Sequence, residues 1–112
     1  MTVKEICARL NLRSLTGECG MDKEVKGVYI CDLLSWVMAH AHAGDVWVTI
    51  QTHTNIIAVA TLLELSSIII SEDAEVEEDT IKKAIEEGIP LLVSEKSSFM
   101  VAKDLIDIGI GS

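Results

Sequence analysis

The sequence predicts an α/β fold in three layers (α/β/α), with a mainly parallel sheet between the helices. Apolar runs of strand length alternate with segments of helical periodicity, and that alternation is typical of strand–helix–strand units. The chain has 112 residues, 49% of them hydrophobic, and a single proline, so it is long enough for one packed core and too short for two. Right-handed crossovers are expected to cover both faces of the sheet. We therefore treat residues 1–112 as a single domain.

The first elements are a short helix and a short strand. Thr2 followed by Glu5 is a capping-box pattern, and apolar side chains at helical spacing continue from it to Leu10. Leu12–Leu15 alternates apolar and polar residues before a glycine-rich turn, which indicates a brief edge strand.

Four strand–helix pairs follow. Each strand is a short run rich in β-branched and other apolar residues, and the runs are Val25–Ile30, Val46–Ile50, Ser66–Ile70 and Pro90–Val93. The helices are expected after these strands, at Leu33–Met38 and onward to a stop at Gly44, at Asn55–Leu63, at Thr80–Glu87, and from Ser97 or Ser98 to Ile106. Asp32 and Asn55 are expected to cap the first two helices. The first of these helices is apolar enough to be mostly buried, and its Trp36 is a candidate for a buried dimer seam.

Charge and cysteine content limit the function classes. Nine Lys and Arg against 18 Asp and Glu give a net charge of −9, which disfavours nucleic acid and membrane surfaces as partners. Three cysteines without a Cys-x-x-Cys pair argue against a disulfide framework and against a zinc or iron–sulfur site. The charged N-terminus and the lack of an apolar run near ~20 residues predict neither a secretory signal nor a membrane span. We expect a cytoplasmic protein with no cofactor.

Candidate ligand-binding residues lie where the strands end, because ligands of open parallel sheets bind at the carboxyl ends of the strands. Gln51–Asn55 places five consecutive polar residues between an apolar strand and an apolar helix. The alternative interpretation of these residues is helix capping and loop hydrogen bonding. The full set of predicted ligand-binding residues is Asp32, Gln51, Thr52, His53, Thr54, Asn55 and Ser94.

The ligand class is constrained by charge and by missing motifs. The same strand ends carry Asp32, Glu72, Asp73 and Glu95 against Lys96, so a bare polyphosphate is disfavoured unless a divalent cation bridges it. No phosphate-binding or dinucleotide-binding glycine motif occurs.

Metal binding and catalysis have weaker support. The acidic run 72–79 is interpreted as the solvated start of a helix. His40 and His42 are two positions apart and do not lie on one helix face. No metal site is therefore predicted. No catalytic residue is assigned, although His53 with Asp32 is a candidate acid/base pair.

Residues 22–28 have the sequence Asp-Lys-Glu-Val-Lys-Gly-Val, and this segment resembles the signature of the DRTGG domain family. In residues 22–28, Asp22 and Gly27 match the signature, whereas Lys23, Lys26 and Val28 replace its arginine, threonine and second glycine. Residues 32–39, 49–56 and 87–90 extend the resemblance over nearly the whole chain.

This resemblance implies a fold similar to the N-terminal domain of HPr kinase/phosphorylase and of some Mur ligases. It implies a non-catalytic regulatory or ligand-binding module, often dimeric, of a kind found beside CBS domains and in phosphate acetyltransferases. Free-standing members occur near iron-only hydrogenase. A lysine at position 23 cannot reproduce the two-pronged hydrogen bonding of an arginine.

Three functional hypotheses follow. The first is a homodimeric regulatory module that binds a small polar ligand, or a nucleotide with a divalent cation. The second is a protein-interaction subunit that docks on a redox partner of the iron-only hydrogenase type or on a kinase-type partner. The third is a small enzyme that uses His53 as acid/base.

Overall fold

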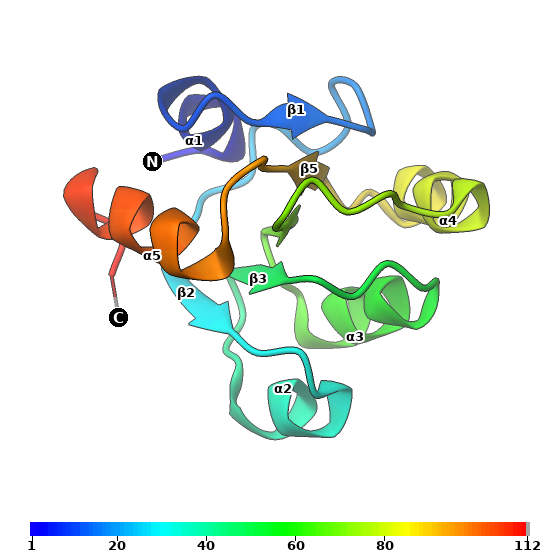
Figure 1. Cartoon of the computed structure of the whole chain (residues 1–112). Coiled ribbons are helices and arrows are strands. Elements are labelled where there is room, and N and C mark those ends of the chain that lie inside the picture. The colour runs from blue at the N-terminus through cyan, green and yellow to red at the C-terminus, as the bar shows by residue number, and fades with distance from the viewer. Residues whose placement is uncertain (112) are drawn as a thin grey trace.

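A computed structural model describes residues 1–111, which form five helices and one five-stranded sheet (Figure 1). The elements in chain order are α1 (Val3–Arg9), β1 (Arg13–Ser14), β2 (Gly27–Ile30), α2 (Leu34–His40), β3 (Asp45–Thr49), α3 (Asn55–Leu63), β4 (Ser67–Ile70), α4 (Glu78–Glu87), β5 (Leu91–Val93) and α5 (Ser98–Asp107). The predicted order of elements is confirmed. None of the helices in residues 1–111 has the length and apolarity of a membrane-spanning segment.

The sheet has the strand order β1-β5-β4-β3-β2. Strands β2 to β5 are parallel and each pairs with the next one along the chain, whereas the two-residue β1 runs antiparallel beside β5. The start of β1 therefore lies at the same edge of the sheet as the carboxyl ends of the other four strands. This edge, called the carboxyl edge below, holds the candidate site.

The helices lie in two layers on opposite faces of the sheet. Because β2 to β5 are neighbours in chain order and the crossovers are right-handed, the three crossover helices α2, α3 and α4 all lie on one face. The expectation that crossovers cover both faces is wrong: the other face is covered by α1 and α5, which precede and follow the parallel strands. Figure 1 shows α1 and α5 on the left of the sheet, and α3 and α4 on its right.

Alternate side chains of the strands form two cores. On β3, Trp47 is fully buried in the core beneath α2, α3 and α4, while Val46 and Val48 enter the core beneath α1 and α5. This burial on both faces explains why the strands appear in the sequence as continuous apolar runs.

The predicted caps are correct for the first and last helices and wrong for two between them. Thr2 and Glu5 form the capping box of α1, and Ser97 accepts a hydrogen bond from the Met100 amide at the start of α5. The N-caps of α2 and α3 are Leu33 and Thr54, and neither side chain makes a capping hydrogen bond. Asp32 is instead bonded to the end of β3, and Asn55 is the first residue of α3.

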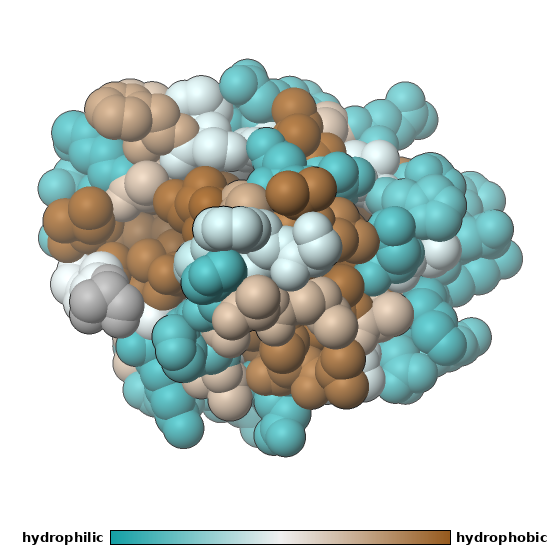
Figure 2. Space-filling view, turned by 90° about the horizontal axis from the view of Figure 1, so that it is seen from below, coloured by the Kyte–Doolittle hydropathy of each residue, from teal (hydrophilic) through white to brown (hydrophobic). Residues whose placement is uncertain are grey.

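The expectation of a mostly buried α2 is also wrong. Only Val37 of this helix is buried, whereas Leu33 at its N-cap is 61% exposed and Trp36 is 54% exposed. The helix lies beside β2 at the outer edge of the sheet, so only one of its sides meets other elements. Figure 2 views the molecule from the α2 side and shows the apolar atoms that this arrangement leaves at the surface.

Candidate functional site

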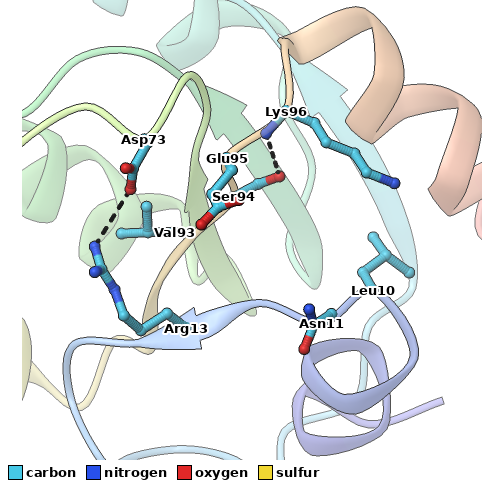
Figure 3. A pocket seen from close by; sticks show the side chains of 8 residues that line it. All are labelled: Leu10, Asn11, Arg13, Asp73, Val93, Ser94, Glu95 and Lys96. Carbon is cyan, nitrogen blue, oxygen red and sulfur yellow. Dashed lines mark hydrogen bonds and ion pairs between the residues drawn. The ribbon is translucent and has the colours of Figure 1, made fainter.

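A crevice opens at the carboxyl edge beside the end of β5, lined by residues 93–96, by residues of the segment from Leu10 to Arg13, and by Asp73 of the loop after β4. After β4 the chain turns to α4 on one face of the sheet, and after β5 it turns to α5 on the other face. Crevices of this kind, at the carboxyl ends of neighbouring strands whose connections leave on opposite sides, are where open α/β sheets bind ligands. The crevice has a volume of about 230 Å³ and is closed on its third side by the start of β1 (Figure 3). Its lining residues are Leu10, Asn11, Arg13, Asp73, Val93, Ser94, Glu95 and Lys96.

The backbone beside the crevice is held in a strained conformation. Glu72 and Asp73 are consecutive non-glycine residues in the left-handed region, with φ of 63° and 51°. Their amides donate to the carbonyls of Lys96 and Ser94, both at 2.8 Å, so the two loops are tied together. The left-handed conformation costs a non-glycine residue about 1–2 kcal/mol. Strain of this kind collects at functional sites, because the surrounding structure has to enforce it.

The two basic side chains of the crevice, Arg13 and Lys96, are each paired with a carboxylate. Arg13 lies 3.5 Å from the Asp73 carboxylate, and both side chains are more than half exposed. Lys96 lies 2.7 Å from Asp104, which is on α5. Exposed ion pairs contribute at most about 1 kcal/mol, so an incoming acidic group could replace Asp73 at the Arg13 guanidinium.

Ser94 supplies a buried polar group to the same crevice. Its side-chain oxygen accepts a hydrogen bond from the Lys96 amide at 3.1 Å, and a hydroxyl that accepts one bond can still donate another. Figure 3 shows this bond and the position of Ser94 between Glu95 and Lys96. Of the seven predicted ligand-binding residues, Ser94 is the one that lines this crevice.

Asp32 and Gln51 fasten the ends of two strands to each other. The Asp32 carboxylate accepts from the Thr49 hydroxyl at 2.7 Å and from the Ile50 amide at 2.9 Å. The Gln51 side-chain amide donates to the Asp32 carbonyl at 2.9 Å. These polar groups are therefore engaged in connecting the end of β2 to the end of β3.

The remaining predicted residues lie around the start of α3. The Thr52 carbonyl accepts from the buried Thr80 hydroxyl of α4 at 2.8 Å, and Nδ1 of the exposed His53 accepts from the Asn55 amide at 3.4 Å. Thr54 and Asn55 line a shallower groove between α3 and α4, together with acidic and basic residues of α4. The structure thus separates the predicted site into three places, and no hydrogen bond joins His53 to Asp32 within residues 1–111.

Arg13, Asn11 and Asp73 line the crevice but were not among the predicted ligand-binding residues. Arg13 reaches the crevice because β1 pairs antiparallel with β5, a contact between segments about 80 residues apart, as in the register of Arg13 with Val93. A basic residue at the start of a predicted edge strand is the signal that could have indicated it. No group of three His, Cys, Asp or Glu residues that could hold a metal ion occurs in the part of the chain that the structure describes.

Comparison with known proteins gives a match by structure. No family model and no curated protein matches the sequence. A solved structure of the CBS and DRTGG domains of the regulatory region of Clostridium perfringens pyrophosphatase, complexed with the activator diadenosine tetraphosphate, superimposes with a TM-score of 0.70 at 13% identity. The fold is of the DRTGG type. The match covers 94% of this chain and 46% of that one, so the chain spans less than half of the solved regulatory region.

Proposed function

We propose that this protein is a non-catalytic regulatory module that binds a small ligand with an acidic group in the crevice between the end of β5 and the start of β1. One observation carries the proposal. Arg13, whose guanidinium faces Asp73, and Ser94, beside which Lys96 lies, line one hollow at the end of β5. A guanidinium and a neutral donor together suit a carboxylate or a phosphate.

A nucleotide is the first ligand class to test. The structurally similar pyrophosphatase region binds a nucleotide activator, and it is described as regulatory. Two basic and two acidic side chains line the crevice, so their charges cancel; they are Arg13, Lys96, Asp73 and Glu95. A polyphosphate would therefore need a divalent cation to offset the repulsion from the two carboxylates. A volume of about 230 Å³ is below that of a typical drug-sized pocket, so the crevice would hold the acidic part of a ligand and leave the rest outside.

The absence of a catalytic role is part of the proposal. The lining residues of the crevice include no histidine or cysteine, and the Lys96 ammonium is paired with Asp104. No hydrogen bond joins the Ser94 hydroxyl to the carboxylate of Asp73 or Glu95 within residues 1–111, so no base is positioned to activate it. The candidate base His53 lies outside the crevice, at the exposed start of α3.

Thermal unfolding with a ligand panel tests the proposal. The panel holds mono- and polyphosphate nucleotides with and without Mg²⁺, sugar phosphates and carboxylic acids. A ligand at 100 times its dissociation constant adds about 2.7 kcal/mol, and each kcal/mol raises the midpoint of a domain near this size by roughly 4–8 °C. A true ligand should therefore raise the midpoint by at least about 10 °C.

Two matched variants locate the site. Arg13→Gln should abolish the ligand-induced rise, because it removes the guanidinium from the crevice. Asn55→Ala, at the groove between α3 and α4, should leave the rise intact. The opposite pattern would move the ligand site to Gln51–Asn55, and a panel without any effect would refute the ligand-binding proposal.

A second candidate function is docking on a partner protein. The observation in its favour is α5, on which Phe99 is 77% exposed and Ile106 is 64% exposed on a chain of net charge −9. Docking through the acidic surface predicts binding that weakens as salt concentration rises, and docking through α5 predicts loss of binding in Phe99→Ser. If wild type captures a redox or kinase-type partner, and neither high salt nor Phe99→Ser weakens the binding, then docking through the acidic surface and docking through α5 are both contradicted.

A further inference from the structure

The charged groups of the crevice differ in how fully the protein itself satisfies them. The Lys96 ammonium lies 2.7 Å from the carboxylate of Asp104, whose side chain is only 21% exposed, so the charge of Lys96 is already neutralised. Arg13 has a longer and more exposed contact, 3.5 Å to Asp73. Glu95 is exposed and makes no ion pair or side-chain hydrogen bond within residues 1–111. Arg13 and Glu95 are therefore the charges that a ligand can most easily engage.

These pairings leave the crevice with a negative charge that a ligand has to match. With Lys96 neutralised by Asp104, Arg13 stands against Asp73 and Glu95, and one net negative charge remains. An acidic group that replaces Asp73 at the guanidinium also releases the Asp73 carboxylate inside the same crevice. Like charges at short range repel, so a purely anionic ligand is disfavoured. A ligand that carries a positive group beside its acidic group is favoured.

The crevice also holds the acceptors that an ammonium group requires. An ammonium has three donors and no acceptor. The Asp73 and Glu95 carboxylates supply two acceptors, and a third is the side-chain carbonyl of Asn11, which makes no hydrogen bond within residues 1–111. For the acidic group, Arg13 and the Ser94 hydroxyl are donors. Figure 3 shows Arg13 and Asn11 on the β1 side of the crevice, with Ser94 and Glu95 across from them.

The volume of the crevice limits the size of the ligand. At about 30 Å³ for each non-hydrogen atom, the share of a water molecule in the liquid, a crevice of about 230 Å³ holds about eight such atoms. Free alanine, serine, threonine and valine are within this limit. Leu10 and Val93 offer apolar contacts to an aliphatic side chain.

Backbone strain is concentrated around the crevice. Within residues 1–111, the non-glycine residues with positive φ are Asn11, Glu64, Glu72 and Asp73. Three of these four adjoin the crevice, one on the β1 side and two in the loop after β4. Strain of this kind persists where the surrounding structure enforces it, and it collects at ligand-binding sites. Two of the acceptors for an ammonium, on Asn11 and Asp73, are therefore held by strained backbone.

We propose that the crevice binds a small free α-amino acid as a zwitterion. Its carboxylate is bound by Arg13 and Ser94. Its ammonium is bound by the side chains of Glu95, Asp73 and Asn11. This inference rests on the proposed ligand-binding function and narrows its ligand class. Because the amino acid supplies its own positive charge, its binding requires no divalent cation.

Titration followed by NMR of the backbone amides tests the proposal, in buffer with EDTA so that no divalent cation can supply the positive charge. The probes are L-alanine, L-serine, L-threonine and L-valine. Each is compared with its N-acetyl derivative, which lacks the positive charge, and with its amide, which lacks the carboxylate. The free amino acids should shift the amide signals of residues 93–96. They should bind roughly threefold to fivefold more tightly than either derivative, because each derivative loses one exposed ion pair.

Substitutions that remove one charge give a second readout. Glu95→Gln should weaken the binding of free amino acids by roughly threefold to fivefold and should strengthen the binding of their N-acetyl derivatives, because it removes an attraction for the ammonium and a repulsion for the carboxylate. Arg13→Gln should weaken both. Glu86→Gln makes the same change of charge at the groove between α3 and α4, and this matched control should change neither. The NMR spectra show at the same time whether each variant is folded.

The outcomes separate this proposal from the function on which it rests. If the amino acids bind no more tightly than their N-acetyl derivatives, or if Glu95→Gln does not weaken their binding, the zwitterion proposal is wrong. Binding of any acidic ligand that depends on Arg13 would still support the proposed function in that case. If no amino acid, carboxylic acid or nucleotide binds, both proposals are wrong.

Discussion

Replacing Asp32 by alanine should lower the stability of the folded chain, because Asp32 connects the ends of two strands. The substitution removes the acceptor of the Thr49 hydroxyl, which is fully buried, and of the Ile50 amide. A buried donor without a partner costs about 1–3 kcal/mol. The Ile50 amide belongs to an exposed residue, so water can replace its lost acceptor at a cost of a few tenths of a kcal/mol.

Asp32→Ala should therefore lower the free energy of unfolding by about 2 kcal/mol in total, which corresponds to a thermal midpoint lower by roughly 8–16 °C. Differential scanning calorimetry of Asp32→Ala, Asp32→Asn and wild type measures this difference. Asp32→Asn keeps an oxygen acceptor at the same position and should lose less than half as much. A double-mutant cycle with Thr49→Val then isolates the pair, because removing the donor as well should recover part of the loss.

Two outcomes would refute this reasoning about Asp32. One is a thermal midpoint of Asp32→Ala within about 2 °C of wild type, because an unpaired buried hydroxyl should lower the free energy of unfolding by more than that shift implies. The other is strict additivity of Asp32→Ala and Thr49→Val, because residues that share a hydrogen bond should be coupled by at least about 0.5 kcal/mol.

Three smaller predictions concern single groups. Glu64 ends α3 with φ of 56°, so Glu64→Gly should stabilise the fold by about 1 kcal/mol, seen as a higher unfolding midpoint. Burial raises the pKa of the Cys7 thiol, whose sulfur lies 3.2 Å from the Leu12 carbonyl, so alkylation of Cys7 followed by peptide mass spectrometry should be slower in folded than in denatured protein. Hydrogen bonds from Thr2 lower the pKa of the Glu5 carboxyl group. The ionised carboxylate should therefore stabilise the fold above the ordinary glutamate pKa, and this stabilisation should be lost as pH falls through the lowered pKa. In pH-dependent unfolding, Glu5→Gln should lose less stability on acidification than wild type.

Local patterns in the sequence were sufficient to predict the elements and the fold class. Continuous apolar runs such as Val46–Ile50 indicated strands that are buried on both faces, and β3 is fully buried from Asp45 to Thr49. The capping box at Thr2 and Glu5 depends on residues three positions apart, so it could be predicted from the sequence alone.

The errors arose where a residue's role depends on distant segments. Asp32 has the right spacing to cap α2, but the end of β3 offers it a hydroxyl and an amide, and these contacts span 17 and 18 residues. Trp36 lies in an apolar helix, but the strand order places that helix at the edge of the sheet, where one of its sides meets no other element in the described residues. Neither the strand order nor the position of α2 can be obtained from hydrophobic periodicity.

The strand order accounts both for the position of the crevice and for the exposure of α2. Because β2 to β5 follow one another across the sheet, the crossover helices α2, α3 and α4 all cover one face. The other face is covered by α1 and α5, which precede and follow the parallel strands in the chain. The chain must therefore change faces after β5, and Ser94, the first residue of the connection that does so, lines the crevice. At the other end of the same series, β2 has no later strand to cover its edge, and α2 is left with Trp36 exposed.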